Sequence, residues 1–189
     1  MQQISNYYTL YLHKIKRYYT PMKKTLSLLV LSAILFSSCM KNENKCNFSD
    51  RNVVVPPTEL KALEDSLVAH NVTNAIKDPN GFYYRVSNAG TGKSVSNLCS
   101  IIYVSYKGKF FNGNVFDATP TGEFANFQLG EVIDGWRKGI PLIKGGGDIV
   151  LYIPPALGYG SSDRVDNNGN IVIPKNSYLV FEVHVESIQ

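Results

Sequence analysis

Apolar and polar residues alternate through much of the chain after Gly81, which is the pattern of β-strands with one buried face. The clearest example is the segment Tyr178–Ile188. Its apolar side is formed by Leu179, Phe181, Val183 and Val185, and its polar side by Glu182, His184 and Glu186. Shorter strands are predicted over residues 82–87, 99–107, 124–129 and 148–153, and a hairpin over 109–116 turns at Asn112-Gly113.

Two helices are predicted beside these strands. In Thr58–His70, three leucines at positions 60, 63 and 67 share one face, and Thr58 is a candidate N-cap. A shorter helix over Gly135–Leu142 is limited by Pro141. The combination predicts an α+β fold, in which a twisted antiparallel sheet is covered on one face by one short helix.

The N-terminal part has the organisation of a bacterial export signal. Lys23 and Lys24 precede an apolar stretch of 14 residues, which is too short for a membrane span and ends in two serines. A cysteine directly after small residues resembles the lipobox of bacterial lipoproteins, although Phe36 replaces the usual leucine. This resemblance implies that Cys39 is the lipid anchor. The alternative is a buried apolar helix that ends in cysteine.

The chain therefore divides into five expected segments. Residues 1–21 are interpreted as an extension before a natural start at Met22, and residues 22–38 as the lipoprotein signal peptide. The remaining segments are a lipidated cysteine with a flexible tether over 39–57, an accessory helix and linker over 58–78, and a globular domain over 79–189.

Charge and cysteine content limit the partners. The formal net charge is +4, but five of the 19 Lys and Arg residues lie before residue 25, and no acidic residue precedes Glu43. Without residues 1–38, 14 basic and 15 acidic residues remain, so no nucleic-acid partner is indicated. Export permits a disulfide between Cys46 and Cys99. Because Cys46 falls in the expected tether, two separate thiols are favoured over a bridge.

Several segments resemble phosphate, calcium or metal sites but lack residues that those sites require. The segment 90–94 ends like a phosphate-binding loop, but Ser87 stands where that loop needs glycine and a strand follows it. The loop from Asp166 lacks the glycine and glutamate of a calcium-binding loop. The three histidines have no second ligand at metal spacing, so no metal site is predicted. No cofactor is required by any motif.

A set of aromatic and aliphatic residues remains, within the strings VSYKG, VFD, FQLGEVIDGW, YIPPALGYG, IVIP and YLVFEV. Their order and spacing resemble the FKBP-type peptidyl-prolyl isomerases over Gly81–Gln189, and the leader resembles the exported lipoproteins among them. The resemblance implies a sheet of five to six antiparallel strands wrapped around one short helix. It also implies a pocket with Trp136 as its floor. The implied walls are Tyr106, Phe116, Val132, Ile133, Val172, Ile173 and Phe181, and the polar groups are Asp117 and Tyr159.

The same resemblance implies roles for the polar residues. Tyr159 would hold a substrate carbonyl, Asp117 would interact with the rotating carbonyl, and Tyr106 would orient Asp117. Phe127, Leu129, Leu151 and Val183 are assigned to the core. The chain departs from the family at Ala125, in a segment after Asp117 that lacks an arginine, and in a polar insertion over 161–170.

The function implied is a prolyl isomerase anchored in the bacterial envelope. Its partners would be proline-containing exported polypeptides, the membrane through lipid on Cys39, and macrolides as candidate ligands. Met40 replaces the aspartate that retains some lipoproteins at the inner membrane, which favours the outer membrane. The alternative is a binding module, in which the fold serves as a chaperone or assembly factor with weak or no turnover.

Overall fold

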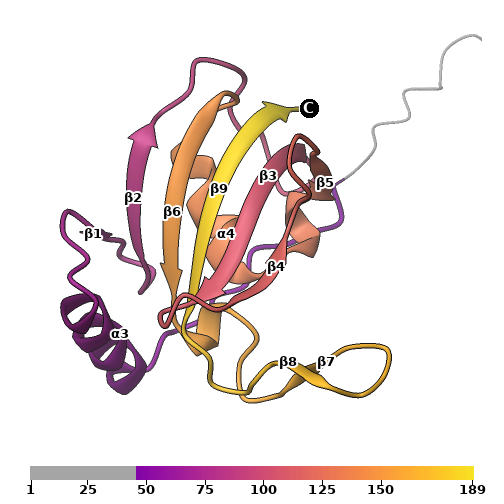
Figure 1. Ribbon diagram of the computed structural model, residues 1–189. Coiled ribbons are helices and arrows are strands. Elements are labelled where there is room, and N and C mark those ends of the chain that lie inside the picture. Colours follow the sequence, from indigo (N-terminus) through magenta and orange to yellow (C-terminus); the bar gives the residue numbers. More distant parts are fainter. Residues whose placement is uncertain (1–45) are drawn as a thin grey trace, which may run out of the picture. The chain divides into compact units, whose positions relative to one another are not determined.

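An antiparallel sheet of seven strands forms the body of the protein in the computed structural model, which describes residues 46–189 (Figure 1). The strand order is β1-β2-β6-β9-β3-β4, and β5 also pairs with β3. The strands are β1 (Ile76–Lys77), β2 (Tyr83–Asn88), β3 (Ile101–Phe110), β4 (Val115–Ala118), β5 (Ala125–Gln128), β6 (Gly147–Ile153) and β9 (Leu179–Ile188). The predicted α+β class is confirmed, with the two-residue strand β1 added at one edge.

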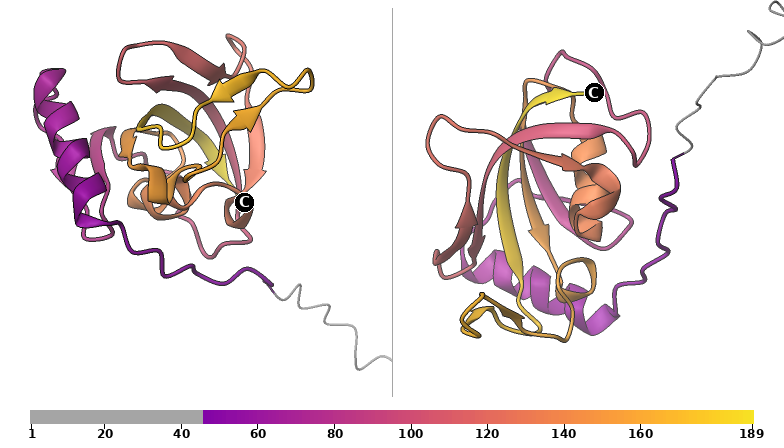
Figure 2. Two further views of the ribbon diagram at one scale, coloured as in Figure 1. Left: turned by 90° about the horizontal axis from the view of Figure 1, so that it is seen from below. Right: turned by 90° about the vertical axis from the view of Figure 1, so that its right-hand side faces the viewer.

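One face of the sheet holds the main core against the short helix α4 (Asp134–Gly139), which continues as the 3-10 turn η2 (Ile140–Leu142) (Figures 1 and 2). The predicted inner face of β9 is confirmed: Leu179, Phe181, Val183 and Val185 are all buried. Glycine allows α4 to approach β6 closely, since a Cβ atom on Gly135 would lie 2.5 Å from Cδ1 of Ile153. This close packing fixes the next residue, Trp136, against the sheet.

The opposite face of the sheet carries the helix α3 (Pro57–Ala69). Leu63 and Leu67 pack there on Tyr152 and Val180, which point away from the main core because side chains alternate along a strand. Thr58 does not cap this helix; Pro56 is the N-cap and makes no side-chain bond. A proline at the first helical position explains the earlier start, because its missing N–H needs no partner there.

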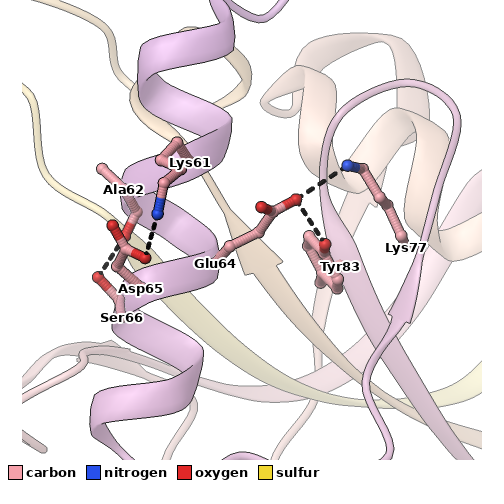
Figure 3. Close-up of polar contacts among 7 residues, drawn as sticks. All are labelled: Lys61, Ala62, Glu64, Asp65, Ser66, Lys77 and Tyr83. Carbon is pink, nitrogen blue, oxygen red and sulfur yellow. Dashed lines mark hydrogen bonds and ion pairs between the residues drawn. The ribbon is translucent and has the colours of Figure 1, made fainter.

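Polar contacts tie the exposed side of α3 to the edge of the sheet (Figure 3). Oε1 of Glu64 accepts hydrogen bonds of 2.8 Å from the Tyr83 hydroxyl and from Nζ of Lys77. One turn away, Lys61 pairs with Asp65 along the helix surface at 2.7 Å. The accessory helix is therefore docked on its own domain within this chain.

The segment before α3, residues 46–56, is called the N-terminal strap here, and it lies against the domain rather than forming part of a free tether. A disulfide joins Cys46 to Cys99, with the two Cα atoms 5.5 Å apart, so the expectation of two separate thiols is wrong. The ring of Phe48 lies where a Cβ atom on Gly130 would be. The backbone oxygen of Ser49 accepts a hydrogen bond of 2.5 Å from the guanidinium of Arg137 on α4. Sequence pattern missed this packing because the strap has no regular secondary structure.

The polar insertion after Tyr159 forms a small hairpin instead of an irregular loop. Its strands are β7 (Arg164–Val165) and β8 (Ile171–Ile173), and they form a separate two-stranded sheet. Figure 1 and the left view of Figure 2 show this hairpin projecting from the body of the domain.

The expected signal peptide and the proposed anchor Cys39 lie outside the described residues. Between residues 46 and 189, no helix is long and apolar enough to cross a membrane. In the same range, no cluster of metal-ligating side chains is found.

Candidate active site

A cavity of about 240 Å³ opens beside α4 on the core side of the sheet. Its lining is mainly aromatic and aliphatic, with two carboxylates. The lining residues are Tyr106, Asp117, Phe127, Glu131, Val132, Ile133, Trp136, Tyr159 and Phe181. They come from β3, β4, β5, β9, the helix α4 and the segment leading into it, and the turn after η3 (Pro155–Leu157).

Trp136 lies at the floor of this cavity in contact with three other aromatic rings. The ring centroids of Tyr106 and Phe181 each lie 5.3 Å from that of Trp136, and Phe127 lies at 6.0 Å. All three pairs are close to perpendicular, at 87° to 89°. Edge-to-face contacts of this kind add to the burial of aromatic surface, so the indole has one fixed orientation.

Tyr106 and Asp117 form the polar pair of the site. The Tyr106 hydroxyl donates a hydrogen bond of 2.6 Å to Oδ2 of Asp117 on the neighbouring strand β4. The two strands are held in register here because the backbone N–H of Thr119 donates to the carbonyl of Tyr106 at 3.0 Å. Burial is the main cause that raises the pKa of Tyr106, and its bond to Asp117 adds to the shift. The phenol therefore remains a neutral donor.

Tyr159 faces the same cavity from the turn that follows η3. Burial raises the pKa of Tyr159, and the nearby charge of Asp117 raises it further, whereas Arg164 lowers it. The guanidinium carbon of Arg164 lies 5.0 Å from the centre of the Tyr159 ring, in a cation–π contact. The Tyr159 hydroxyl is thus neutral at ordinary pH and able to donate a hydrogen bond.

Seven of the ten residues predicted for the pocket from the sequence line the cavity: Tyr106, Asp117, Val132, Ile133, Trp136, Tyr159 and Phe181. Phe116 does not; it packs behind the wall, with its ring centroid 5.6 Å from that of Phe181. Ile173 is buried in the main core, and Val172 is 38% exposed on the hairpin. Both residues lie on the hairpin strand β8, and neither is among the lining residues of the cavity.

Two lining residues were not predicted. Phe127 was assigned to the core. It is paired with Ile102 of β3, and it both lines the cavity and packs, partly buried, against the main core. Glu131 was missed although it directly precedes Val132 and Ile133, and this adjacency was the available signal.

Residues 92–186, half of the chain, match the family of FKBP-type peptidyl-prolyl cis-trans isomerases. The chain belongs to this family. A probable FKBP-type isomerase of Haemophilus influenzae is 40% identical over 106 residues, which are 56% of this chain and 42% of that protein. FkpA of Escherichia coli K12 is 40% identical over 110 residues, 58% of this chain and 38% of FkpA. The FKBP-type domain thus matches less than half the length of these relatives.

Solved structures agree with the FKBP fold. The crystal structure of FkpA from Escherichia coli has a TM-score of 0.55 and 33% identity, and the match covers 70% of this chain and 63% of that one. AtFKBP13 has a TM-score of 0.55 and 31% identity, covering 61% of this chain and 99% of the other. A peptidyl-prolyl isomerase from Pseudomonas syringae, at 23% identity and a TM-score of 0.58, supports the fold alone.

Proposed function

We propose that the protein is a peptidyl-prolyl cis-trans isomerase that acts through the aromatic cavity. The observation that carries this proposal is an apolar cavity floored by Trp136 in which Asp117 is held by Tyr106. Membership of the FKBP-type family supports it further. The reaction breaks no covalent bond, so the site needs shape and electrostatic fit rather than a nucleophile.

The chemistry of the X–Pro bond explains why an apolar cavity helps. Rotation about this bond loses amide resonance, and the barrier is roughly 18–20 kcal/mol. In the twisted state the carbonyl is less polar than in the planar amide. Transfer from water to an aromatic environment therefore costs the planar amide more free energy than the twisted one. Binding the twisted amide better than the planar one lowers the barrier.

Each polar group has a proposed role in that step. Tyr159 donates its hydroxyl to a substrate carbonyl and so fixes the peptide across the cavity mouth. Asp117 interacts with the carbonyl that rotates, and the hydrogen bond from Tyr106 keeps its carboxylate in position. Trp136, Val132, Ile133 and Phe181 contact the prolyl ring. The same apolar lining makes macrolides candidate ligands.

The substrates proposed are proline-containing segments of exported proteins. The leader before residue 39 supports export, and the disulfide between Cys46 and Cys99 fits an oxidising compartment. In this proposal a lipid on Cys39 anchors the chain in the bacterial envelope, at the outer membrane. Slow X–Pro steps limit the folding of many proteins, and an anchored isomerase would accelerate them.

The activity is tested by NMR exchange spectroscopy on a short peptide with one X–Pro bond, with and without the full-length chain. A concentration-dependent increase in the cis-trans exchange rate supports the proposal. An exchange rate equal to that of the peptide alone, at enzyme concentrations up to that of the peptide, contradicts it.

A further inference from the structure

A second cavity, of about 300 Å³, lies on the face of the sheet that carries α3 and is called the outer cavity here. It is bounded by the end of α3, by strands β2, β6 and β9, and by the residues that join β3 to β4. Figures 1 and 2 show α3 and this β3–β4 turn at the same end of the sheet. The outer cavity shares no lining residue with the candidate active site, so the two cavities are separate.

One wall of the outer cavity is a series of packed rings. Asn71 ends α3 in the left-handed conformation, with a φ of 51°. The ring centroid of His70 lies 5.3 Å from that of Phe111, and the centroid of Phe111 lies 6.1 Å from that of Tyr152. His70 is held in this position because its Nδ1 donates a hydrogen bond of 2.9 Å to the backbone oxygen of Ser66. This wall therefore has a defined shape.

Tyr152 contributes a hydrogen-bond donor to the outer cavity. Its side chain is 5% exposed, and its hydroxyl has no hydrogen-bond partner within residues 46–189. Buried polar groups are normally hydrogen-bonded, so this donor indicates a place for an acceptor. Burial raises the pKa of Tyr152, the charges of Arg85 and Lys109 lower it, and that of Glu182 raises it. These three charged residues line the same cavity, so the neutral hydroxyl lies near its charged end.

The charged residues of the outer cavity leave one positive charge uncompensated. Lys109 and Glu182 form an ion pair with each other. Arg85 is opposite Val150 in the sheet, and Val150 is opposite Glu182, so two strand spacings of about 4.8 Å each separate Arg85 from that carboxylate. Among the salt bridges within residues 46–189, none includes Arg85. With His70 neutral, the lining therefore has the net charge of this one guanidinium.

A guanidinium beside a phenol hydroxyl suits a carboxylate. The planar guanidinium donates two parallel hydrogen bonds to a carboxylate, and a phenol can donate a further one. A carboxylate has one negative charge, which the single uncompensated charge of Arg85 balances. A phosphate monoester has about two at neutral pH, so one would remain unbalanced. The apolar lining of Val72, Phe111 and Val150 adds room for an apolar substituent, and a volume of about 300 Å³ is at the lower end of the range for small-ligand sites.

We propose that the outer cavity binds a small organic carboxylate that has an apolar side group. Arg85 pairs with the carboxylate, the Tyr152 hydroxyl donates to one of its oxygens, and the apolar group lies against Phe111. This chemistry occurs in an acylated apolar amino acid and at the C-terminal residue of a polypeptide. The proposal does not depend on the isomerase function, because the aromatic cavity floored by Trp136 has a different set of lining residues.

The test measures binding to the full-length chain by isothermal titration calorimetry. The probes are N-acetyl-leucine, its neutral amide, phenyl phosphate, and a short peptide that ends in leucine with either a free or an amidated terminus. Arg85→Gln and Tyr152→Phe are the test variants, since Arg85 is exposed and the phenylalanine keeps the buried ring. Lys107→Gln and Tyr103→Phe are the matched controls, because both residues are on strand β3 and neither lines the outer cavity. Urea midpoints check that each variant is folded.

We expect the wild-type chain to bind N-acetyl-leucine with a Kd of about 1 mM and its amide about tenfold or more weakly, because the amide lacks the charge. Arg85→Gln and Tyr152→Phe should each weaken binding of the acid about tenfold, whereas both control variants keep the wild-type Kd. Binding of the free-terminal peptide would assign the carboxylate to a polypeptide terminus. Binding of N-acetyl-leucine without binding of the peptide would assign it to a free acid, and either result supports the proposal.

Four results would overturn the proposal. They are the absence of saturable binding of any carboxylate probe, equal affinity for N-acetyl-leucine and its amide, tighter binding of phenyl phosphate than of the acid, and an undiminished affinity in Arg85→Gln. If Tyr152→Phe has a lowered urea midpoint, the exposed Arg85 decides the question alone. None of these measurements uses an X–Pro peptide, so failure of the isomerase function would leave the test of the outer cavity unaffected.

Discussion

The Tyr106 hydroxyl and Oδ2 of Asp117 lie 2.6 Å apart, joined by a hydrogen bond between adjacent strands at the mouth of an aromatic cavity. The ring of Tyr106 also packs nearly perpendicular to that of Trp136, with the two ring centroids 5.3 Å apart. One side chain therefore fixes both the carboxylate and the indole. The site depends on this residue for its geometry, although Tyr106 need not itself contact the rotating bond.

Removal of that hydrogen bond should lower activity without unfolding the domain. In Tyr106→Phe the ring contacts remain, and Asp117 loses its donor. A hydrogen bond to a charged group contributes about 1.5–3 kcal/mol, so kcat/KM on an X–Pro peptide should fall at least about tenfold. Tyr103→Phe, on the same strand, is the control and should keep the wild-type rate. Equal rates for both variants would show that the bond to Asp117 has no role.

Stability should fall in alkaline solution. Burial is the main cause that raises the pKa of Tyr106 and Tyr159, and likewise of Tyr83, Tyr152 and Tyr178. An unfolded tyrosine ionises near pH 10, so above that pH the unfolded chain binds fewer protons than the native one. The stabilisation is complete below about pH 10 and is lost as pH rises through the native pKa values. Urea midpoints that stay constant between pH 9 and 11 would contradict this prediction.

The disulfide should contribute substantially to stability. It closes a loop with a sequence separation of 53 residues, and removal of such a crosslink from a small domain costs roughly 2–4 kcal/mol. The Cys46→Ser/Cys99→Ser variant should therefore have a lower free energy of unfolding, measured in urea. Reductant should destabilise the wild-type chain to a similar extent and leave the variant unchanged. A wild-type midpoint that is insensitive to reductant would be the contrary result.

Helix α3 should be stabilised by its buried leucines more than by its surface charges. Leu63 is fully buried against Tyr152 and Val180, so Leu63→Ala should cost about 2–5 kcal/mol. Lys61 is 71% exposed and pairs only along the helix, so Lys61→Ala should leave the unfolding midpoint unchanged. A larger effect at Lys61 than at Leu63 would show that α3 is not docked through its apolar face.

The elements that the sequence predicted well are those with a regular period. The alternation in β9 placed Phe181 on the inner face, and the short helix around Trp136 followed from its position among strands. The motifs also implied that Tyr106 orients Asp117, and a hydrogen bond joins these two side chains. These features depend on local pattern or on matched motifs, both of which a single sequence contains.

The features that sequence missed depend on contacts between distant segments. The N-terminal strap has no periodicity, yet Cys46 pairs with Cys99 and Ser49 binds Arg137. Val172 matched a pocket motif but turned outward because the inserted residues form a hairpin with its own strand pairing. Such contacts arise from tertiary packing, which has no signature in the local order of residues.

The central claim is most directly tested by the exchange rate of an X–Pro peptide in the presence of the wild-type chain and of Asp117→Asn. Asp148→Asn is the matched control, since Asp148 is an aspartate outside the cavity that bonds to His184 at 2.8 Å. We predict that the wild-type and Asp148→Asn chains accelerate exchange equally and that Asp117→Asn loses about tenfold or more of kcat/KM, the magnitude expected when one charge-assisted contact is removed. A wild-type chain that does not accelerate exchange, or an Asp117→Asn variant as active as the wild type, would contradict the account.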